Sequence, residues 1–182
     1  MPLTQLLIII ALILFILFAM LLAKYNSFVK LRNRVKTNFS DISIQLKKRA
    51  ALIQNLVELV KEYADHESKT FTQVAKARSA VDSSSSAQES AQAENMLSQT
   101  LRSLMVVSED YPELKANDNY IQVKQDLLVA ENDIVRARAI YNQSVENYNN
   151  AIQMFPGLLV ANMFEFKEAD LFQPTAVETQ TK

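Results

Sequence analysis

The chain has 182 residues, of which 19 are basic and 20 are acidic, so its net charge is −1 and no overall field favours nucleic acid or strongly acidic partners. A single glycine and four prolines are too few for the many turns of a multi-stranded fold, so we expect an all-α protein. The absence of cysteine excludes disulfides, thiolate metal sites and thiol nucleophiles.

Residues 6–23 form an unbroken apolar run of 18 residues, long enough to cross most of a hydrocarbon core of about 30 Å. We therefore predict a single transmembrane anchor over residues 1–23. A cleaved signal peptide is the alternative, but no basic residue precedes the run and its end lacks a small-x-small pattern. Five basic residues follow it within residues 24–36, which predicts an outside N-terminus and a cytoplasmic domain. The opposite topology, with a periplasmic domain, remains open.

A long amphipathic helix is predicted over about residues 24–81, because no proline or glycine lies between Pro2 and Pro112. Its apolar residues recur mostly every three or four positions, which places them on one side of the helix. They are Phe28, Leu31, Val35, Phe39, Ile42, Leu46, Ile53, Leu56, Val60, Tyr63, Phe71 and Val74.

Two further helices complete the predicted bundle, which occupies residues 24–172. A serine-rich loop at residues 82–86 precedes a helix over about 87–108, and Ser86 with Glu89 has the form of a capping box. Asn117 or Asp118 caps a helix over about 118–154, before an apolar tail at 158–172. The stripe of this last helix is Tyr120, Val123, Leu127, Ile134, Tyr141, Val145, Tyr148 and Ile152. The polar end, residues 173–182, is expected to be disordered.

The three predicted helices differ in length. At a rise of 1.5 Å per residue, the first would be about 85 Å long, the second about 33 Å and the third about 55 Å. If the second helix covers only the membrane-distal part of the first, the stripe near the membrane has no partner within the chain. Such a stripe should be buried by something, so we predict self-association there, with bending of the first helix as the alternative. The candidate residues are Phe28, Leu31, Val35, Phe39, Ile42 and Leu46.

Charged residues also lie on the apolar stripe of the last predicted helix, at Glu131 and Arg138. A buried charge without a partner costs several kcal/mol, so each should pair across to another helix. Arg49 and Arg78 are the candidate partners of Glu131. We interpret these residues as fixing helix register, with a polar ligand groove as the alternative.

A tyrosine–asparagine pair occurs at Tyr141-Asn142 and again, seven residues later, at Tyr148-Asn149. Buried tyrosine and asparagine side chains need hydrogen-bond partners. The pairs are therefore predicted to be polar clamps between helices, rather than a binding site.

The sequence offers no complete catalytic or metal-binding constellation, so no catalytic, cofactor or metal residues are predicted. His66 is the one histidine, with Glu62 and Glu67 nearby, whereas a di-metal bundle site needs two histidine motifs. One glycine cannot make a nucleotide-binding loop, and no Gly-x-Ser-x-Gly turn is present.

An ordered series of short motifs resembles the LemA family and covers nearly the whole chain outside the serine loop and the extreme tail. The motifs are Tyr25-Asn26, Arg32-Asn33, Phe39-Ser40-Asp41-Ile42, Gln45-Leu46-Lys47-Lys48-Arg49, Leu52-Ile53, Asn55-Leu56-Val57, Tyr63-Ala64, His66-Glu67, Ala77-Arg78, Tyr111 to Asn117, Glu131, Ala137-Arg138, Tyr141-Asn142, Tyr148-Asn149 and Phe155-Pro156. One departure is Gln54, where the family pattern has proline, so the first helix is expected to be straighter here.

The resemblance implies a membrane-anchored helical bundle of the bacterial inner membrane with no established enzymatic activity and no catalytic residues to carry over. It also implies association with envelope stress or membrane proteases. The sequence therefore favours a non-enzymatic scaffold or adaptor, with coiled-coil-like helix packing, that forms homo-oligomers and binds unidentified membrane proteins, without nucleic acid or cofactors. The alternative is a ligand- or metal-binding sensor that uses polar residues within the bundle.

Overall fold

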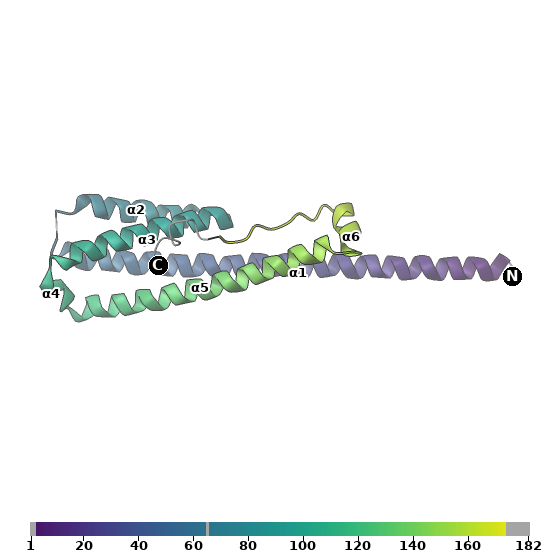
Figure 1. The fold of residues 1–182 in the computed structure, drawn as a ribbon, viewed down its shortest axis with the longest axis horizontal. Coiled ribbons are helices and arrows are strands. Elements are labelled where there is room, and N and C mark those ends of the chain that lie inside the picture. Colours follow the sequence, from purple (N-terminus) through teal and green to yellow (C-terminus); the bar gives the residue numbers. More distant parts are fainter. Residues whose placement is uncertain (1–2, 65, 174–182) are drawn as a thin grey trace, which may run out of the picture. The chain divides into compact units, whose positions relative to one another are not determined.

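The computed structural model describes residues 3–64 and 66–173, which contain helices and no strand. The helices are α1 (Leu3–Lys61), α2 (Ser68–Ser83), α3 (Ala87–Glu109), α4 (Pro112–Lys115), α5 (Asp118–Gln153) and α6 (Gly157–Met163) (Figure 1). The predicted all-α class, with a long apolar N-terminal helix and a helical bundle, is confirmed. The tail predicted to be disordered lies outside the described residues, except for Gln173.

The chain divides into two compact units, and both α1 and α5 contribute residues to each. Unit 1 contains the described residues up to Thr37 together with Gln143–Ala169. Unit 2 contains Asn38–Asn142 together with the described residues from Asp170 onward. Each unit is therefore described by its own internal contacts.

The first part of α1, in unit 1, is a candidate membrane span. Its most apolar 18-residue window has a mean hydropathy of 3.4, and none of that window is buried within the protein. Every side chain from Leu3 to Met20 is exposed. An exposed apolar helix of this length is what a bilayer core requires.

The end of α1 differs from the prediction, because the helix stops at Lys61 and a second helix begins at Ser68. Tyr63 and Ala64 both donate backbone hydrogen bonds to the Val60 carbonyl, at 3.1 and 2.8 Å, which closes the last turn. The absence of proline and glycine permits a longer helix but does not force one. The break lets the stripe of the second helix be buried, and that burial outweighs helix propensity. Helix α1 does continue without interruption through Gln54.

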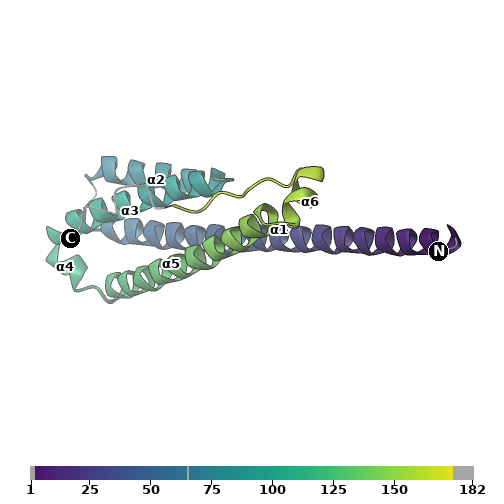
Figure 2. The same ribbon diagram turned by 45° about the vertical axis from the view of Figure 1, so that its right-hand side comes forward.

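Helices α2 and α3 lie side by side within unit 2 (Figures 1 and 2). Val74, Ala77 and Val81 are buried on α2, while Leu97 and Leu104 are buried on α3. Small residues are buried on both helices, Ala77 on α2 and Ser90 and Ala93 on α3. The pair thus forms an α-hairpin around the serine-rich connection.

The start of α3 is capped as the sequence predicts. The Ser86 hydroxyl accepts a hydrogen bond from the Glu89 backbone N–H at 3.2 Å. The Glu89 carboxylate in turn accepts from the Ser85 backbone N–H at 2.7 Å and from the Ser85 hydroxyl at 2.9 Å. These hydrogen bonds, chiefly from the Ser85 backbone, lower the pKa of Glu89.

Helix α5 begins after a short helical turn, α4, that the sequence analysis did not predict. The Asn117 side chain accepts a hydrogen bond from the Asn119 backbone N–H at 2.9 Å, so Asn117 is the capping residue of the two proposed. The stripe predicted for this helix is buried, except that Val123 is half-buried. Seven of its eight residues are therefore correctly assigned to the core: Tyr120, Leu127, Ile134, Tyr141, Val145, Tyr148 and Ile152.

The stripe of α1 near the membrane has partners within the chain, so the premise for self-association there is wrong. In unit 1, Phe28 is 1% exposed and its ring meets that of Phe166 at 5.4 Å between centroids. In unit 2, Ile42 and Leu46 are fully buried. The other candidates are buried or half-buried: Leu31, Val35 and Phe39. The prediction paired the first helix with the second alone, whereas residues of α5 and the segment after it cover this stripe.

Candidate functional site

An ion pair between a buried arginine and a partly exposed glutamate joins α1 to α5 in unit 2. The Arg49 Nη2 atom lies 2.8 Å from a carboxylate oxygen of Glu131, and only 5% of the arginine side chain is exposed. Arg49 is thus the partner of Glu131, while Arg78 lies exposed on α2. The Nε and Nη1 atoms of Arg49 have no hydrogen-bond partner within the described structure, and neither does the buried Oε1 atom of Gln45. A buried donor or acceptor left unsatisfied costs about 1–3 kcal/mol.

A second ion pair joins α5 to α3. The Arg138 Nη1 atom lies 3.2 Å from Glu94, and the two side chains are 13% and 7% exposed. The Arg138 guanidinium also lies over the Phe172 ring, 5.2 Å from its centroid. Sequence reasoning placed Arg138 on the apolar stripe but did not identify Glu94, because nothing local to α3 marks that glutamate as buried.

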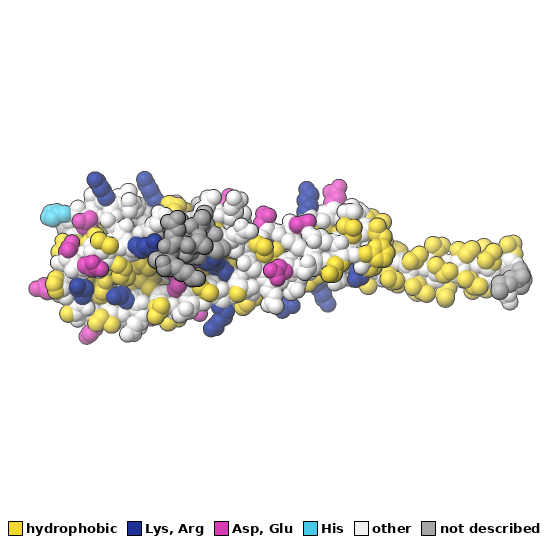
Figure 3. All heavy atoms as spheres, viewed as in Figure 1, with side chains coloured by type: hydrophobic (Ala, Val, Ile, Leu, Met, Phe, Trp, Pro, Cys, Tyr) yellow, Lys and Arg dark blue, Asp and Glu magenta, His cyan; other side chains and the backbone are white. Residues whose placement is uncertain are grey.

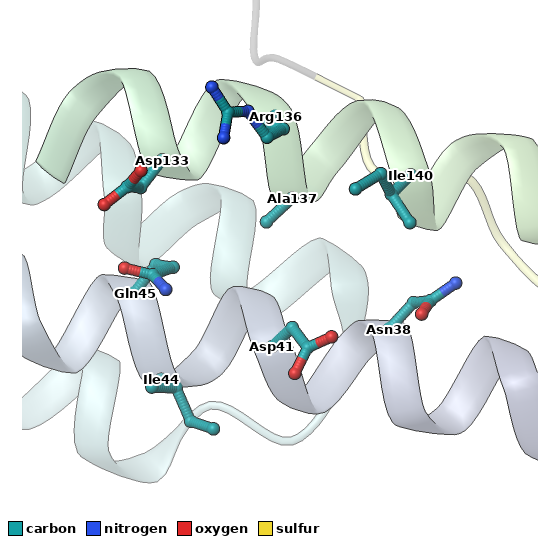
Figure 4. A pocket seen from close by; sticks show the side chains of 8 residues that line it. All are labelled: Asn38, Asp41, Ile44, Gln45, Asp133, Arg136, Ala137 and Ile140. Atoms are coloured by element: carbon teal, nitrogen blue, oxygen red, sulfur yellow. The ribbon is translucent and has the colours of Figure 1, made fainter. Parts of the chain in front are cut away.

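A shallow groove of about 270 Å³ lies between α1 and α5 in unit 2 (Figure 4). Its lining residues come from facing turns of the two helices: Asn38, Asp41, Ile44, Gln45, Asp133, Arg136, Ala137 and Ile140. Lys48 reaches across to Asp133 at 3.4 Å. The lining mixes both charges, which suits the groove to binding a polar group.

The first tyrosine–asparagine pair holds an extended segment in unit 2. The Tyr141 hydroxyl donates to the Asp170 carbonyl at 2.8 Å. The Asn142 amide donates to the Phe172 carbonyl at 3.1 Å and accepts from the Phe172 backbone N–H at 2.8 Å. One side chain thus satisfies both backbone groups of Phe172, whose ring is 1% exposed.

The second pair makes the same contacts in unit 1. The Tyr148 hydroxyl donates to the Lys167 carbonyl at 2.8 Å. The Asn149 amide donates to the Ala169 carbonyl and accepts from its backbone N–H, both at 2.9 Å. We call residues 167–172 the strap, because this extended segment is held by side chains of α5 through its own backbone.

The partner of these clamps differs from the prediction, which paired the side chains with another helix. The apolar residues of the strap do not recur at a helical or strand spacing. Its backbone carbonyls, which the clamps contact, are common to every residue, so the sequence does not identify the strap as their partner. Burial raises the pKa of both Tyr141 and Tyr148. Asp170 adds to the rise at Tyr141, while Arg32 opposes it at Tyr148.

Among the described residues, no group of three or more histidine, aspartate or glutamate side chains is placed to bind a metal ion. His66 is exposed in the connection between α1 and α2, beside the half-buried Glu67. Glu62 is exposed at the end of α1.

The outer face of α5 in unit 2 carries a second apolar stripe that the sequence analysis missed. Ile121, Leu128 and Val135 are 42%, 65% and 54% exposed and recur every seven residues. Each directly follows a buried stripe residue, which places the second stripe about 100° around the helix. Gln125 and Asn132, one turn after Ile121 and Leu128, are uncharged, whereas Lys124 lies beside the stripe between Ile121 and Leu128. The paired apolar residues at 120/121, 127/128 and 134/135 are the signal that identifies this stripe.

Comparison with known proteins places the chain in a family. The sequence profile of the LemA family matches residues 38–182. Magnetosome protein MamQ 1 of Paramagnetospirillum magneticum is 25% identical over 181 residues, covering 85% of this chain and 66% of that protein. MamQ of Magnetospirillum gryphiswaldense is 24% identical over 178 residues, covering 84% and 65%. Protein LemA of Metamycoplasma hominis is 23% identical over 158 residues, covering 84% and 70%.

These observations define an all-α protein that combines a candidate membrane span with a helical bundle. None of the three relatives is named for a catalytic activity. The chain belongs to the LemA family. It spans just under two thirds of the length of the MamQ relatives.

Proposed function

We propose that this protein is a non-enzymatic scaffold, anchored in the bacterial inner membrane by the first part of α1, that self-associates and binds membrane proteins. Its bundle lies in the cytoplasm, as the flanking basic residues favour. Its partners act in envelope stress or are membrane proteases. The exposed stripe on α5 carries this proposal, because an apolar face of this kind marks an interaction surface.

The stripe suits a second helix, since its seven-residue repeat supplies one of the two core positions of a coiled-coil heptad, with Gln125, Asn132 and Ala139 at the other. Copies anchored in one membrane with the same topology present α5 in parallel. Such an arrangement brings Asn132 opposite the same residue of a second copy, where two amides can hydrogen-bond. We therefore place self-association on the stripe of Ile121, Leu128 and Val135, instead of the buried stripe of α1.

Cysteine crosslinking in native membranes tests this proposal, since the chain has no cysteine of its own. We expect Asn132→Cys to form a crosslinked dimer, whereas Gln73→Cys, exposed on α2, should not. Adding Leu128→Glu should abolish the Asn132→Cys dimer without unfolding the bundle, because Leu128 is 65% exposed. Equal crosslinking at both cysteine positions would contradict self-association through α5.

Binding of protein partners has a separate test. Affinity purification of the Leu128→Glu protein should lose partners that a Gln73→Glu protein retains, if the same face binds them. Partners retained by both proteins would assign binding to another surface.

A polar-ligand sensor is a second candidate, favoured by the unsatisfied atoms of Gln45 and Arg49 and by the groove that Gln45 lines. The other polar residues weighed for this role engage protein groups instead, through the ion pairs of Glu131 and Arg138 and the strap contacts of Tyr141 and Asn142. A thermal-shift screen of small polar solutes tests it: stabilisation that Gln45→Leu abolishes would favour the sensor.

A further inference from the structure

Helix α6, in unit 1, turns an apolar face away from the protein. Gly157, Val160 and Ala161 are buried on its inner side. The outer side and its flanks carry large apolar side chains that are exposed. They are Met154 at 66%, Phe155 at 81%, Leu158 at 44%, Leu159 at 60%, Met163 at 64% and Phe164 at 43%. Figure 3 shows apolar side chains gathered where α6 lies beside α1.

Ring contacts fix this face at the end of the candidate membrane span. The Phe164 ring meets that of Tyr25 edge-on, with 4.9 Å between centroids. Phe166 contacts Tyr25 as well, at 5.6 Å. Tyr25 lies two residues after Ala23, the last residue of the apolar run, which is only about 3 Å along the helix axis. The headgroup region on each side of a bilayer is about 5–7 Å thick, so Tyr25 and the Phe164 ring packed against it would lie at its level.

The segment that contains α6 has the composition of an interfacial contact. No charged residue occurs between Glu146 and Glu165, a stretch of 18 residues. Lys24, which ends the span, and aromatic residues at Tyr25, Phe155 and Phe164 are the types that anchor proteins at headgroup level. The apolar part is too short to cross a membrane, so it would lie in the interface.

The protein also holds this segment in place. Gly157 packs so tightly that a Cβ atom there would lie 3.0 Å from the Phe28 ring, and Asn149 secures the chain beyond α6 at Ala169. The exposed face is therefore presented by a fixed loop with both ends attached, which reduces the entropy lost on binding.

We infer that residues 154–164 insert into the interfacial region of the bilayer that α1 spans, which gives the protein a second contact with lipid. This inference rests on the membrane anchoring proposed above. The contact uses other residues than the α5 stripe and does not depend on self-association.

Tryptophan substitution in the full-length protein tests the inference, because the chain has no tryptophan. Three single variants are reconstituted in vesicles of phosphatidylcholine and phosphatidylglycerol: Leu159→Trp on α6, Phe15→Trp in the span and Leu128→Trp on α5. Each replaced side chain is exposed, so the fold accommodates the larger ring. Quenching is measured with lipids brominated near the headgroup or at the chain ends, and with aqueous acrylamide.

We expect Leu159→Trp to be quenched by headgroup-proximal bromine at least about twofold more strongly than Leu128→Trp, with blue-shifted emission. Phe15→Trp should respond most to bromine at the chain ends. If Leu159→Trp responds to acrylamide and not to brominated lipid, or is shielded from both by protein, the inference is wrong while anchoring stands. If Phe15→Trp also fails to respond to brominated lipid, the anchoring itself is wrong.

Discussion

The two units surround different stretches of α1 with different chemistry. In unit 1, Tyr25 and Phe28 meet the rings of Phe164 and Phe166, and Gly157 permits the close approach. In unit 2, a mainly aliphatic core also holds the Phe172 and Tyr141 rings, and ion pairs form at Arg49 and Arg138. Each unit nevertheless holds its part of the strap with a tyrosine–asparagine pair of its own. The pair is Tyr148-Asn149 in unit 1 and Tyr141-Asn142 in unit 2. Because the clamp side chains bind backbone groups, we expect the clamp to be equally strong beside either core.

The strap side chain with the largest expected effect is Phe172 in unit 2. Phe172→Ala removes a fully buried ring and should cost about 4 kcal/mol of local stability. Hydrogen exchange at the amides of residues 169–172 measures the loss. Leu171→Ala is the control, because Leu171 is 39% exposed, and a comparable loss there would contradict a role for the buried ring.

The two ion pairs should respond unequally. Arg138→Met removes the cation from the Glu94 carboxylate, which is 7% exposed, and should cost about 3 kcal/mol. Arg49→Met should cost only about 1 kcal/mol, since Glu131 is 36% exposed and two nitrogen atoms without hydrogen-bond partners are removed. Urea unfolding followed by circular dichroism measures both changes in detergent.

The exposed Arg136→Met provides the control on the same helix, with little change expected. Equal losses for the two buried arginines would show that exposure of the partner carboxylate does not govern the cost.

Unit 1 should lose stability when a side-chain atom is added at its tightly packed glycine, Gly157. In Gly157→Ala the new Cβ atom would meet the Ala151 carbonyl oxygen and the Phe28 ring, a clash worth about 2 kcal/mol. Faster hydrogen exchange is expected in residues 143–169, with unit 2 amides such as Leu97 and Leu104 unchanged. Asn162→Ala, on the exposed side of α6, should leave exchange unaltered. Faster exchange spread evenly over both units would remove the distinction between them.

The asparagines test whether the clamp acts alike in both units. Asn142→Ala and Asn149→Ala each remove two hydrogen bonds to the strap, so each should cost about 2 kcal/mol. Exchange at the Phe172 amide reports on the first variant and exchange at the Ala169 amide on the second. A cost in one unit alone would mean that the core, rather than the backbone contact, sets the strength of the clamp.

The tyrosines should give the smallest effect, and one that depends on pH. Tyr141→Phe and Tyr148→Phe each remove one hydrogen bond, at about 1 kcal/mol. Burial raises the pKa of both hydroxyls above 10.0, so the folded state holds the proton more tightly than the unfolded state. Their contribution is complete below about pH 10 and is lost as pH rises through the folded-state pKa.

Urea unfolding between pH 9 and 11 measures this dependence, and the titration of lysine residues in this range is common to all variants. The double phenylalanine variant should lose less stability over this range than the unsubstituted protein. An identical slope would contradict a raised pKa at either tyrosine.

The sequence predicts the features that depend on apolar repeats, including the candidate span and the buried face of α5. It does not predict the break between Lys61 and Ser68, because burial of Val74, Ala77 and Val81 decides it without any proline or glycine. The tyrosine–asparagine pairs can be recognised from their spacing, but their partners are backbone groups, which look alike in every sequence. The outer stripe of α5 could have been predicted, because adjacent apolar residues occur at 120/121, 127/128 and 134/135.

The strap also has a consequence for the order in which the protein is completed. Residues 38–142 leave the ribosome before the strap, so the Asn142 amide and the Arg138 side chain are made before Phe172 exists. During this interval the amide hydrogen-bonds to water. Unit 2 therefore reaches its final packing only after some thirty further residues have been synthesised beyond Asn142. Most of these residues, 143–169, belong to the second part of unit 1.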